Sequence, residues 1–450
     1  MLRRFNIKRL FSAIIAVMVA SFVVLNAQYG EGDTQLSKST EKARKNPYSA
    51  TEALHKAMER TVAAGGAMPL PTVSLITVCP GCEVYELYGH ASIRIKFVGN
   101  DFAVNYGLFD FDTPNFVYRF VKGETDYLVD AYPMWLFMRD YTLERRRVIE
   151  QELNLTDEQT VRLVRLIEEE LKPENQSYRY NYVRENCSTK IVDVVEKAIG
   201  DTITLARPAS EGADHWTYRD IMHRYNSGYP WNDFGIDLVL GVGLDYPISN
   251  REKVFAPVIL SEMMAKSTVP DSLGNKIPIV RATHVLIPGR FEGCRKPDTP
   301  WLLSPMAVFI LALIIAAFLF RRDRRRRRPT RWFDILIFSA FGVAGLLLSF
   351  LILFSFHEAV SPNWLYVTVN PLCFFGAFSI FNRRVGKVVL CYHWLNLCSI
   401  IVLIAILLPV TGQVINGAMY PLLAVAALRS ATNIFIHRCE KKATVKKTRA

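Results

Sequence analysis

The chain has 450 residues, a mean hydropathy of +0.14 and a net charge of +12, so it is longer than one domain usually is and more apolar than a typical soluble protein. The charge does not indicate a nucleic-acid partner, because residues 28–301 carry 32 Lys and Arg against 38 Asp and Glu. The basic excess instead flanks apolar runs, as at residues 321–331, which is typical of membrane topology signals. We therefore exclude nucleic acid as a partner and expect the membrane to be one.

Residues 1–27 predict a signal peptide or an uncleaved signal anchor. Basic residues between Arg3 and Arg9 precede an apolar run from Leu10 to Leu25, and cleavage after a small residue suits the bond that follows Ala27. Residues 28–71 begin as a polar arm and are then broken by glycines and prolines, so we expect a tether. In both cases the segment that follows is exported.

Residues 72–300 predict an exported α+β domain. Alternating apolar residues indicate strands at 73–78, 90–96 and 102–107. Thr156 and Gln159 form a capping box in front of a helix that we expect to end near Leu171. Strands with interspersed helices and no regular βαβ period are typical of α+β folds.

Residues 301–437 predict a five-helix transmembrane domain, followed by a basic cytoplasmic tail at 438–450. Each of five apolar stretches is close to the roughly 20 residues that a helix needs to cross a bilayer. They cover residues 302–320, 332–356, 364–381, 388–409 and 416–436. Basic residues flank alternate turns, so the C-terminus is expected in the cytoplasm and the exported domain in the periplasm.

Cys187 is the centre of the chemistry that the sequence predicts. It precedes an apolar run with helical spacing that ends at Ile199 and Gly200, so it is expected in the first turn of a helix. The free N–H groups and the dipole there favour the thiolate, which lowers the pKa of the thiol and makes the sulfur a nucleophile. The alternative is a buried structural cysteine or half of a disulfide.

His90 supplies the imidazole that cysteine catalysis requires. A thiolate mechanism needs a base and a third polar group that holds the tautomer of the ring. Asn105, on the strand that follows the His90 strand, is expected to reach the ring. An amide at the end of a strand or in a turn is an equally good interpretation of Asn105.

Several longer motifs surround these residues. Residues 79–95 read Cys-Pro-Gly-Cys-Glu-Val-Tyr-Glu-Leu-Tyr-Gly-His-Ala-Ser-Ile-Arg-Ile. Residues 105–116 read Asn-Tyr-Gly-Leu-Phe-Asp-Phe-Asp-Thr-Pro-Asn-Phe, and residues 186–189 read Asn-Cys-Ser-Thr. Tyr-Arg-Asp at 218–220 and Pro-Trp-Asn-Asp-Phe-Gly-Ile-Asp-Leu-Val-Leu-Gly at 230–241 follow.

Together these motifs resemble the Lnb N-terminal periplasmic domain family, the exported part of the Bacteroides-type lipoprotein N-acyltransferase. That family is similar to circularly permuted NlpC/P60 (papain-like) thiol enzymes. The resemblance implies a papain-like exported domain with His90 and Cys187 as the catalytic pair. It also implies a phospholipid acyl donor, diacylated lipoproteins as acceptors, and a place in the bacterial inner membrane. Cys82 departs from the family pattern, where an ordinary polar residue is expected.

Other residues are weaker candidates for the site. Four neighbours of the catalytic pair are expected to contact substrate or an oxyanion: Tyr88, Tyr106, Asn186 and Ser188. At the outer membrane face and within the last apolar stretch we expect four membrane-face residues: His357, Glu358, Asn370 and Arg429. For the first three residues, contact with lipid headgroups and simple anchoring at the interface are equally good interpretations. For Arg429, the structural alternative to a functional charge is snorkelling or a helix bend.

The remaining polar candidates are interpreted as structural. Asp233 and Asp237 could act as paired carboxylates, but their Gly-bounded aromatic setting favours a structural turn. His223 is expected at the surface or at the end of a strand.

The cysteines allow two natural disulfides in an oxidising envelope: Cys79 with Cys82, or one of these with Cys294. A zinc site at Cys79 and Cys82 lacks a second Cys/His pair with suitable spacing. We therefore expect no metal and no cofactor.

The most concrete function predicted is acyl transfer from a phospholipid, through a thioester on Cys187, to the α-amine of a diacylglyceryl-cysteine lipoprotein. A cell-wall peptidase or lipid hydrolase of the same fold is the enzymatic alternative. A membrane-anchored binding protein with a structural Cys187 is the non-enzymatic one. Five spans favour a bilayer-borne substrate, because a peptidoglycan hydrolase needs a single tether.

Overall fold

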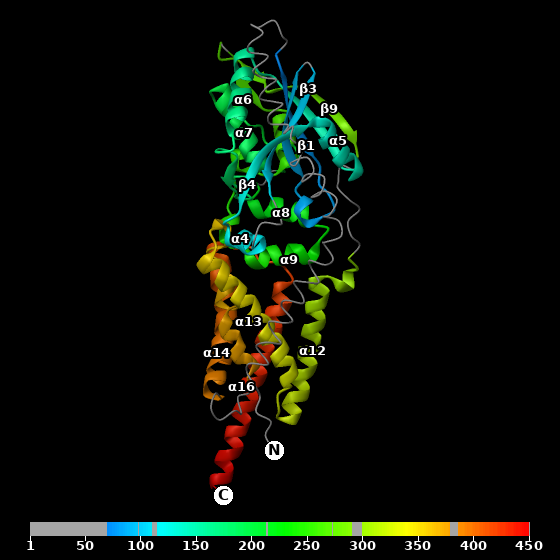
Figure 1. Cartoon of the computed structure of the whole chain (residues 1–450). Helices are drawn as coiled ribbons and strands as arrows, with labels where there is room; N and C mark the ends of the chain where they lie inside the picture. The colour runs from blue at the N-terminus through cyan, green and yellow to red at the C-terminus, as the bar shows by residue number, and fades with distance from the viewer. Residues whose placement is uncertain are drawn as a thin grey trace.

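The computed structural model describes residues 70–97, 99–109, 115–212, 215–271, 273–289, 299–378 and 386–449. An α+β domain lies at one end of the elongated molecule and a bundle of long helices at the other (Figure 1). The predicted fold class, α+β followed by an all-α membrane domain, is therefore confirmed. The predicted signal segment, most of the tether and Cys294 lie outside the described residues.

A seven-stranded antiparallel sheet forms the centre of the α+β domain, in the order β6-β4-β3-β2-β1-β5-β9. Its strands are β1 (Thr72–Val78), β2 (His90–Phe97), β3 (Asn100–Leu108), β4 (Asp126–Pro133), β5 (Arg147–Leu153), β6 (Ser177–Arg179) and β9 (Val280–Pro288). A separate two-stranded ribbon consists of β7 (Thr268–Pro270) and β8 (Lys276–Pro278). The strands predicted at 73–78, 90–96 and 102–107 are thus β1, β2 and β3.

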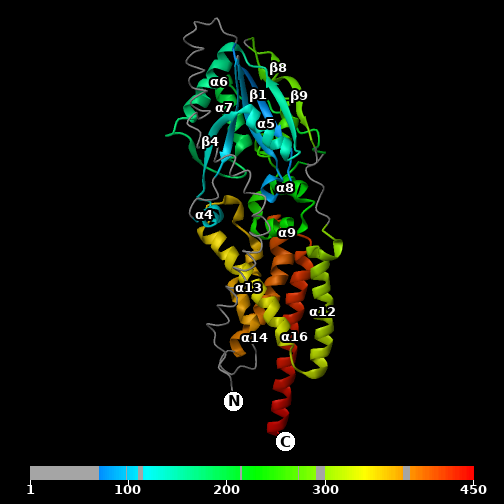
Figure 2. The same ribbon diagram turned by 45° about the vertical axis from the view of Figure 1, so that its right-hand side comes forward.

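Helices cover both faces of the sheet (Figures 1 and 2). α6 (Asp157–Glu170) and α7 (Cys187–Ile199) pack on one face over a core that includes Ile93 and Val195. α5 (Met134–Leu143) covers part of the other face, where Phe137 meets Ile76 and Ala103. Fully burying each such side chain stabilises the fold by roughly 1.5–3 kcal/mol, so α7 and the strand that carries His90 are held in fixed positions.

The two helices predicted from capping signals begin and end close to where the sequence indicates. Thr156 and Gln159 cap α6 reciprocally, as the capping box predicts. α7 begins at Cys187 and ends at Gly200, whose φ of +80° is a left-handed conformation that glycine adopts at little cost.

Short helices at the base of the domain lie next to the bundle: α4 (Phe116–Lys122) contacts α13 (Arg331–Phe354), α9 (Pro230–Val239) contacts α12 (Pro305–Arg326), and α8 (Tyr218–Asn226) packs on α9. The 3₁₀ turn η2 (Val242–Leu244) also meets the bundle, and η1 (Val84–Glu86) precedes β2. α10 (Asn250–Lys253) leads into α11 (Pro257–Met264), which packs on β1, β2 and α7. The structural turn predicted for Asp233 and Asp237 is wrong, because both residues lie on the regular helix α9.

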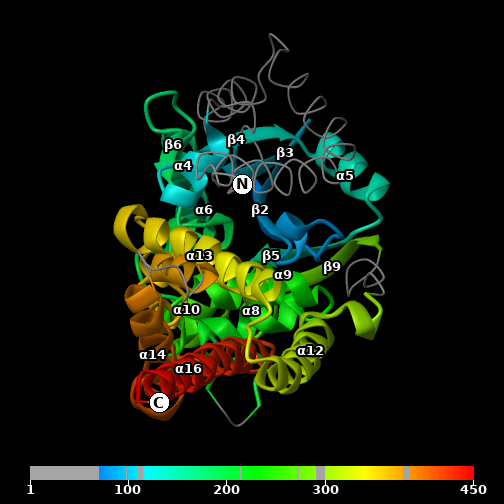
Figure 3. The same cartoon turned by 90° about the horizontal axis from the view of Figure 1, so that it is seen from below.

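Within the described residues, four helices are long and apolar enough to cross a membrane. These spans are α12 (Pro305–Arg326), α13 (Arg331–Phe354), a composite of α14 (Gly386–Val402), the π-turn η7 (Leu403–Leu407) and α15 (Leu408–Thr411), and α16 (Met419–Arg449). Figure 3 shows α16 between α12 and α14. Short 3₁₀ turns, η3 (Trp301–Leu303) and η4 (Glu358–Val360), precede α12 and follow α13.

The third predicted span, residues 364–381, does not form a long α-helix in its described part. It contains η5 (Trp364–Val367) and η6 (Pro371–Ala377). Asn370 lies against Gly345 and Phe374 against Gly342, so the segment runs antiparallel to α13. Because a 3₁₀ helix rises about 2.0 Å per residue, the 4 residues of η5 and the 7 residues of η6 span roughly 22 Å, most of the hydrocarbon thickness of a bilayer. The count of five crossings stays a prediction.

The two halves are joined by backbone hydrogen bonds as well as by the chain. Phe356 N–H donates to Lys122 O over 2.8 Å, and Gly241 N–H donates to Ala359 O over 2.7 Å. Gly241 approaches Pro362 so closely that a Cβ would lie 2.2 Å from its carbonyl oxygen. The exported domain is therefore packed directly on the outer turns of the bundle.

Candidate active site

Cys187 occupies the first helical position of α7, as the sequence predicts. Asn186 caps this helix: its Oδ1 accepts from Ser188 N–H at 2.9 Å and from Thr189 N–H at 3.1 Å. Its Nδ2 donates to the carbonyl oxygens of Tyr182 and Phe255. The cap directs the N-terminus of α7, and its dipole, at the sulfur.

His90 begins β2 and lies beside Cys187 and Asn105. The side-chain Nε2 of His90 is 3.0 Å from Asn105 Oδ1, and Asn105 is fully buried. The amide nitrogen of Asn105 donates to Ala103 O over 3.2 Å, which orients the amide oxygen toward the ring. Nε2 must then carry the hydrogen, so Nδ1 of neutral His90 is left to accept the thiol proton.

The electrostatics favour transfer of that proton. Burial raises the pKa of the Cys187 thiol, but hydrogen bonding and charge from His90, with a backbone N–H of Ala91, outweigh burial and lower it below its usual range. Burial alone would lower the pKa of His90. The contacts with Cys187 and Asn105 outweigh burial, so the pKa of His90 is raised above its usual value. The pair is thus biased toward thiolate and imidazolium, the reactive form of a cysteine nucleophile.

Tyrosines of the segment before α7 form one wall of the site. A Cβ placed on Gly107, whose φ is +84°, would lie 3.7 Å from Tyr178 Oη and 3.9 Å from Cys187 Cβ. Tyr178 Oη is buried without a hydrogen-bond partner. Tyr180 stacks on Tyr127 with 3.9 Å between ring centroids. The Tyr178 hydroxyl is therefore a donor available near the sulfur.

Sequence reasoning did not assign a role to Tyr178. The alternation of Tyr178, Tyr180 and Tyr182 was visible as a strand-like pattern, but only the fold brings Tyr178 to Gly107.

Three of the predicted substrate or oxyanion candidates are committed to other contacts. Tyr106 Oη donates to Glu170 over 2.7 Å on the α6 face, since neighbouring strand residues point to opposite faces. Tyr88 Oη accepts from Asn226. Asn186 is used entirely as the cap described above.

Ser188 remains near the nucleophile. Its Oγ lies 4.0 Å from Cys187 Sγ, although its side chain is fully buried.

The predicted membrane-face residues separate in the structure. His357 Nε2 lies 2.8 Å from Phe120 O, and Glu358 forms an ion pair with Arg184 over 2.9 Å. Both contacts join the bundle to the exported domain. Asn370 caps η6 beside the middle of α13, so its expected place at the outer face is wrong.

Arg429 is fully buried within the continuous helix α16, so its side chain does not snorkel to the membrane surface. Its guanidinium pairs with Asp334 at 2.6 Å and with Asp323 at 3.0 Å. Asp323 lies in the last turns of α12, at the end of the bundle away from the exported domain. Arg429 therefore ties α12, α13 and α16 together, consistent with a structural role.

The cysteines exclude one of the two predicted pairings. Cys79 is a free, buried thiol, and burial raises its pKa to about 11. Cys82 is disulfide-bonded. The Cys79–Cys82 bridge is therefore wrong, and the alternative partner, Cys294, lies outside the described residues.

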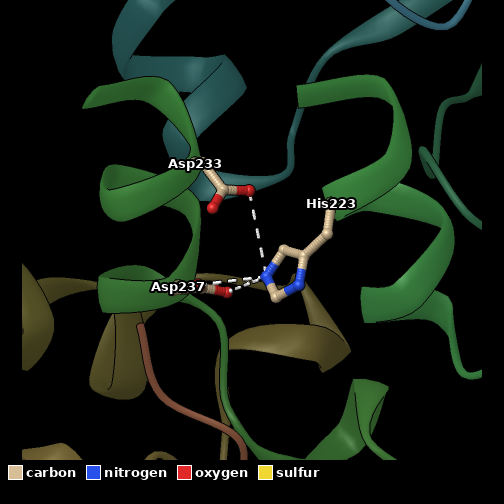
Figure 4. Close-up of side chains that lie close together, drawn as sticks. All are labelled: His223, Asp233 and Asp237. Carbon is tan, nitrogen blue, oxygen red and sulfur yellow. Dashed lines mark hydrogen bonds and ion pairs between the residues drawn. The ribbon is translucent and has the colours of Figure 1, made fainter. Parts of the chain in front are cut away.

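His223, Asp233 and Asp237 come together at the base of the domain (Figure 4). One nitrogen and two carboxylate oxygens within 4.8 Å of one another could hold a divalent cation. However, Asp237 already accepts from His223 at 2.8 Å, from Arg219 at 2.7 Å and from Asn416 at 3.1 Å. These donors occupy the lone pairs that a metal would need, so the geometry favours a network of ion pairs.

This network links the exported domain to the bundle. Asn416 lies between α15 and α16, and the nearby Val414 N–H donates to Asp245, which also pairs with Arg219. The hydrogen bond that His223 donates to Asp237 raises the pKa of His223. His223 is thus part of the domain junction and not a simple surface residue as predicted.

The fold and site define a multi-pass membrane protein whose α+β domain holds a cysteine–histidine–asparagine chain. This chain belongs to the Lnb family: residues 35–224 match the family model of the Lnb N-terminal periplasmic domain, and residues 297–442 match that of the Lnb transmembrane domain. No curated protein and no solved structure matches the chain. The family resemblance stated from the motifs is therefore confirmed over both halves, and the α+β domain is periplasmic.

Proposed function

We propose that this protein is a lipoprotein N-acyltransferase of the bacterial inner membrane, with its C-terminus in the cytoplasm. The observation that carries the proposal is the location of the Cys187, His90 and Asn105 chain directly above the spans. Tyr182, on the segment that leads into Cys187, packs its ring 5.5 Å from His357 at the outer end of α13. Both substrates are lipids, so the bilayer surface concentrates and orients them at such a site.

In the first half-reaction, the Cys187 thiolate attacks the ester carbonyl of a phospholipid. The carbonyl oxygen becomes an oxyanion, and the Tyr178 hydroxyl is the donor that we assign to it. The ester C–O bond then breaks, and imidazolium His90 gives its Nδ1 proton to the leaving oxygen of the lysophospholipid. The products are a Cys187 thioester and neutral His90.

In the second half-reaction, the α-amine of a diacylglyceryl-cysteine lipoprotein attacks the thioester. An α-amine has an unperturbed pKa near roughly 8, so a useful fraction is uncharged at neutral pH. His90 takes the amine proton as the C–N bond forms, and the C–S bond breaks to regenerate the thiolate. Asn105 holds the ring in the same tautomer through both steps.

A labelled phospholipid tests the proposal. The reconstituted protein, given acyl-labelled phospholipid and no lipoprotein, should carry a hydroxylamine-sensitive label on Cys187. Addition of a diacylglyceryl-cysteine peptide should remove the label and yield an amide. Tyr178→Phe should slow the labelling by about 100-fold, the usual cost of losing an oxyanion donor.

Each rival function gives a distinct outcome. Loss of the label to free fatty acid at the same rate with and without peptide would identify a lipid hydrolase. Cleavage of a cell-wall peptide without any label would identify a peptidase. Binding of lipoprotein with neither reaction would leave a membrane-anchored binding protein.

A further inference from the structure

Helix α4 exposes aromatic side chains at the foot of the periplasmic domain. Tyr118 is 53% exposed and Phe120 is 42% exposed, although both are large and lie on a helix packed against the bundle. Two large aromatic side chains this exposed on one short helix are unusual on a soluble surface, and exposed apolar surface of this kind marks interaction sites.

Contacts with α13 place α4 beside the last turns of a membrane span. The Tyr118 ring lies 5.9 Å from that of Phe350, and Phe350 is one turn before the end of α13 at Phe354. The Lys122 ammonium lies 5.8 Å from the Phe356 ring. Because one turn rises about 5.4 Å, Tyr118 reaches below the outer end of the span.

Other spans show aromatic residues at their corresponding ends. Trp301 precedes α12 and is 70% exposed, and Tyr420 lies in the first turn of α16 and is 47% exposed. Tyr and Trp are enriched where a membrane meets water, because an apolar ring and a polar group then each find a suitable environment. The outer membrane boundary therefore passes through the level of α4.

α4 also leads directly to the candidate active site. After the turn at Gly123, β4 begins, and its second residue, Tyr127, stacks on Tyr180. Tyr180 lies close enough to Cys187 for the thiolate charge to raise the pKa of the Tyr180 phenol, second to burial. On the other side, the Phe120 ring lies 6.2 Å from the His357 ring, which lies 5.5 Å from the ring of Tyr182 on the segment that leads into Cys187.

We propose that α4 is an interfacial foot whose Tyr118 and Phe120 insert into the outer leaflet, and that phospholipid held there is the acyl-donor pool for Cys187. The insertion of α4 into the leaflet rests on geometry alone, and the donor-pool assignment rests on the proposed function. The occupant to which the proposal commits is bilayer phospholipid.

Photocrosslinking in proteoliposomes tests the foot. The full-length chain carries benzoylphenylalanine in place of Tyr118 or, in a second variant, Phe120, in vesicles of radiolabelled phosphatidylethanolamine and phosphatidylglycerol. The matched control carries it in place of Trp135, which is 66% exposed on α5. β4 separates α5 from α4 and rises about 3.3 Å per residue away from the membrane. We expect about tenfold more lipid attached at 118 and 120 than at 135.

Two results would overturn the proposal separately. Equal lipid attachment at 118, 120 and 135, or none at 118 and 120, would show that α4 does not enter the leaflet.

A kinetic measurement tests the donor pool. The double substitution of Ser for Tyr118 and Phe120 should raise the apparent KM for bilayer phospholipid about tenfold, roughly the effect of 1.4 kcal/mol. Trp135→Ser should not do so.

Alkylation of Cys187 by iodoacetamide serves as the check that the site is folded in each variant. An unchanged KM in a variant with normal alkylation would remove the donor-pool assignment. The foot can stand if the proposed function fails: crosslinking should persist unchanged in Cys187→Ala, where no thioester forms.

Discussion

Replacing Asn105 by Ala removes the oxygen that accepts from His90 Nε2 and leaves that N–H buried without a partner. A hydrogen bond to a charged group contributes about 1.5–3 kcal/mol, and His90 is charged in the reactive pair. Since each 1.36 kcal/mol changes a rate about tenfold, formation of the Cys187 thioester should slow by roughly 10- to 150-fold.

The same substitution should change how Cys187 alkylation depends on pH. The Asn105 bond helps to raise the pKa of His90, so its loss lowers that pKa and removes the imidazolium at a lower pH. Without the cation, the pKa of Cys187 rises. Alkylation by iodoacetamide should therefore slow markedly near neutral pH, and the difference from the unsubstituted protein should shrink as the pH rises past the ordinary pKa of a thiol.

A control and a refutation are available for this experiment. Asn154 is another strand-end amide, and its Nδ2 donates to the carbonyl oxygen of Pro278 at the exposed end of β8. Asn154→Ala should change neither the thioester rate nor the alkylation profile. If Asn105→Ala behaves in the same way, Asn105 is a structural amide and the tautomer argument fails.

Cys187→Ser and His90→Ala should each abolish acyl transfer in a folded protein. Because the two side chains act as a unit, the double variant should be no worse than either single variant. Losses of rate that add up in the double variant, measured by single-turnover kinetics, would contradict this. A reporter fused at the C-terminus should behave as cytoplasmic and one inserted near Ser210 as periplasmic, and a periplasmic C-terminus would refute five crossings. Arg219→Gln should destabilise the protein by about 3–5 kcal/mol, because it removes the buried cation that pairs with the carboxylates of Asp237 and Asp245. In thermal unfolding, Arg281→Gln, which removes an exposed ion pair, should cost at most about 1 kcal/mol.

Local signals in the sequence were sufficient for the nucleophile and its helix. The start of α7 depends on Asn186 and its end on Gly200, and both act through contacts within a few residues. The proximity of His90 followed from the resemblance and from the need for a base, and the structure brings His90 and Asn105 together. The likeness to NlpC/P60 enzymes beyond the α+β class stays an expectation.

Features that depend on distant contacts were not predictable. Tyr106 and Asn105 are adjacent in sequence, yet only the position of α6 decides that Tyr106 binds Glu170 instead of substrate. The sequence around Arg429 suggests snorkelling or a helix bend and does not reveal its ion-pair partners, because these lie about 100 residues away in sequence, on α12 and α13. The third apolar stretch has the composition of a span, but its path is set by the close approach of Asn370 to Gly345.

The backbone bonds between the two halves have a consequence for biogenesis. Lys122 O and Gly241 N–H find their partners only after the turn that follows α13 has been made, more than 100 residues later in synthesis. Until then, the base of the periplasmic domain presents unpaired peptide groups and the exposed rings of α4 to the periplasm. The domain therefore matures together with the bundle, and a fragment that ends near residue 300 should be prone to aggregate even though it contains every residue of the candidate active site.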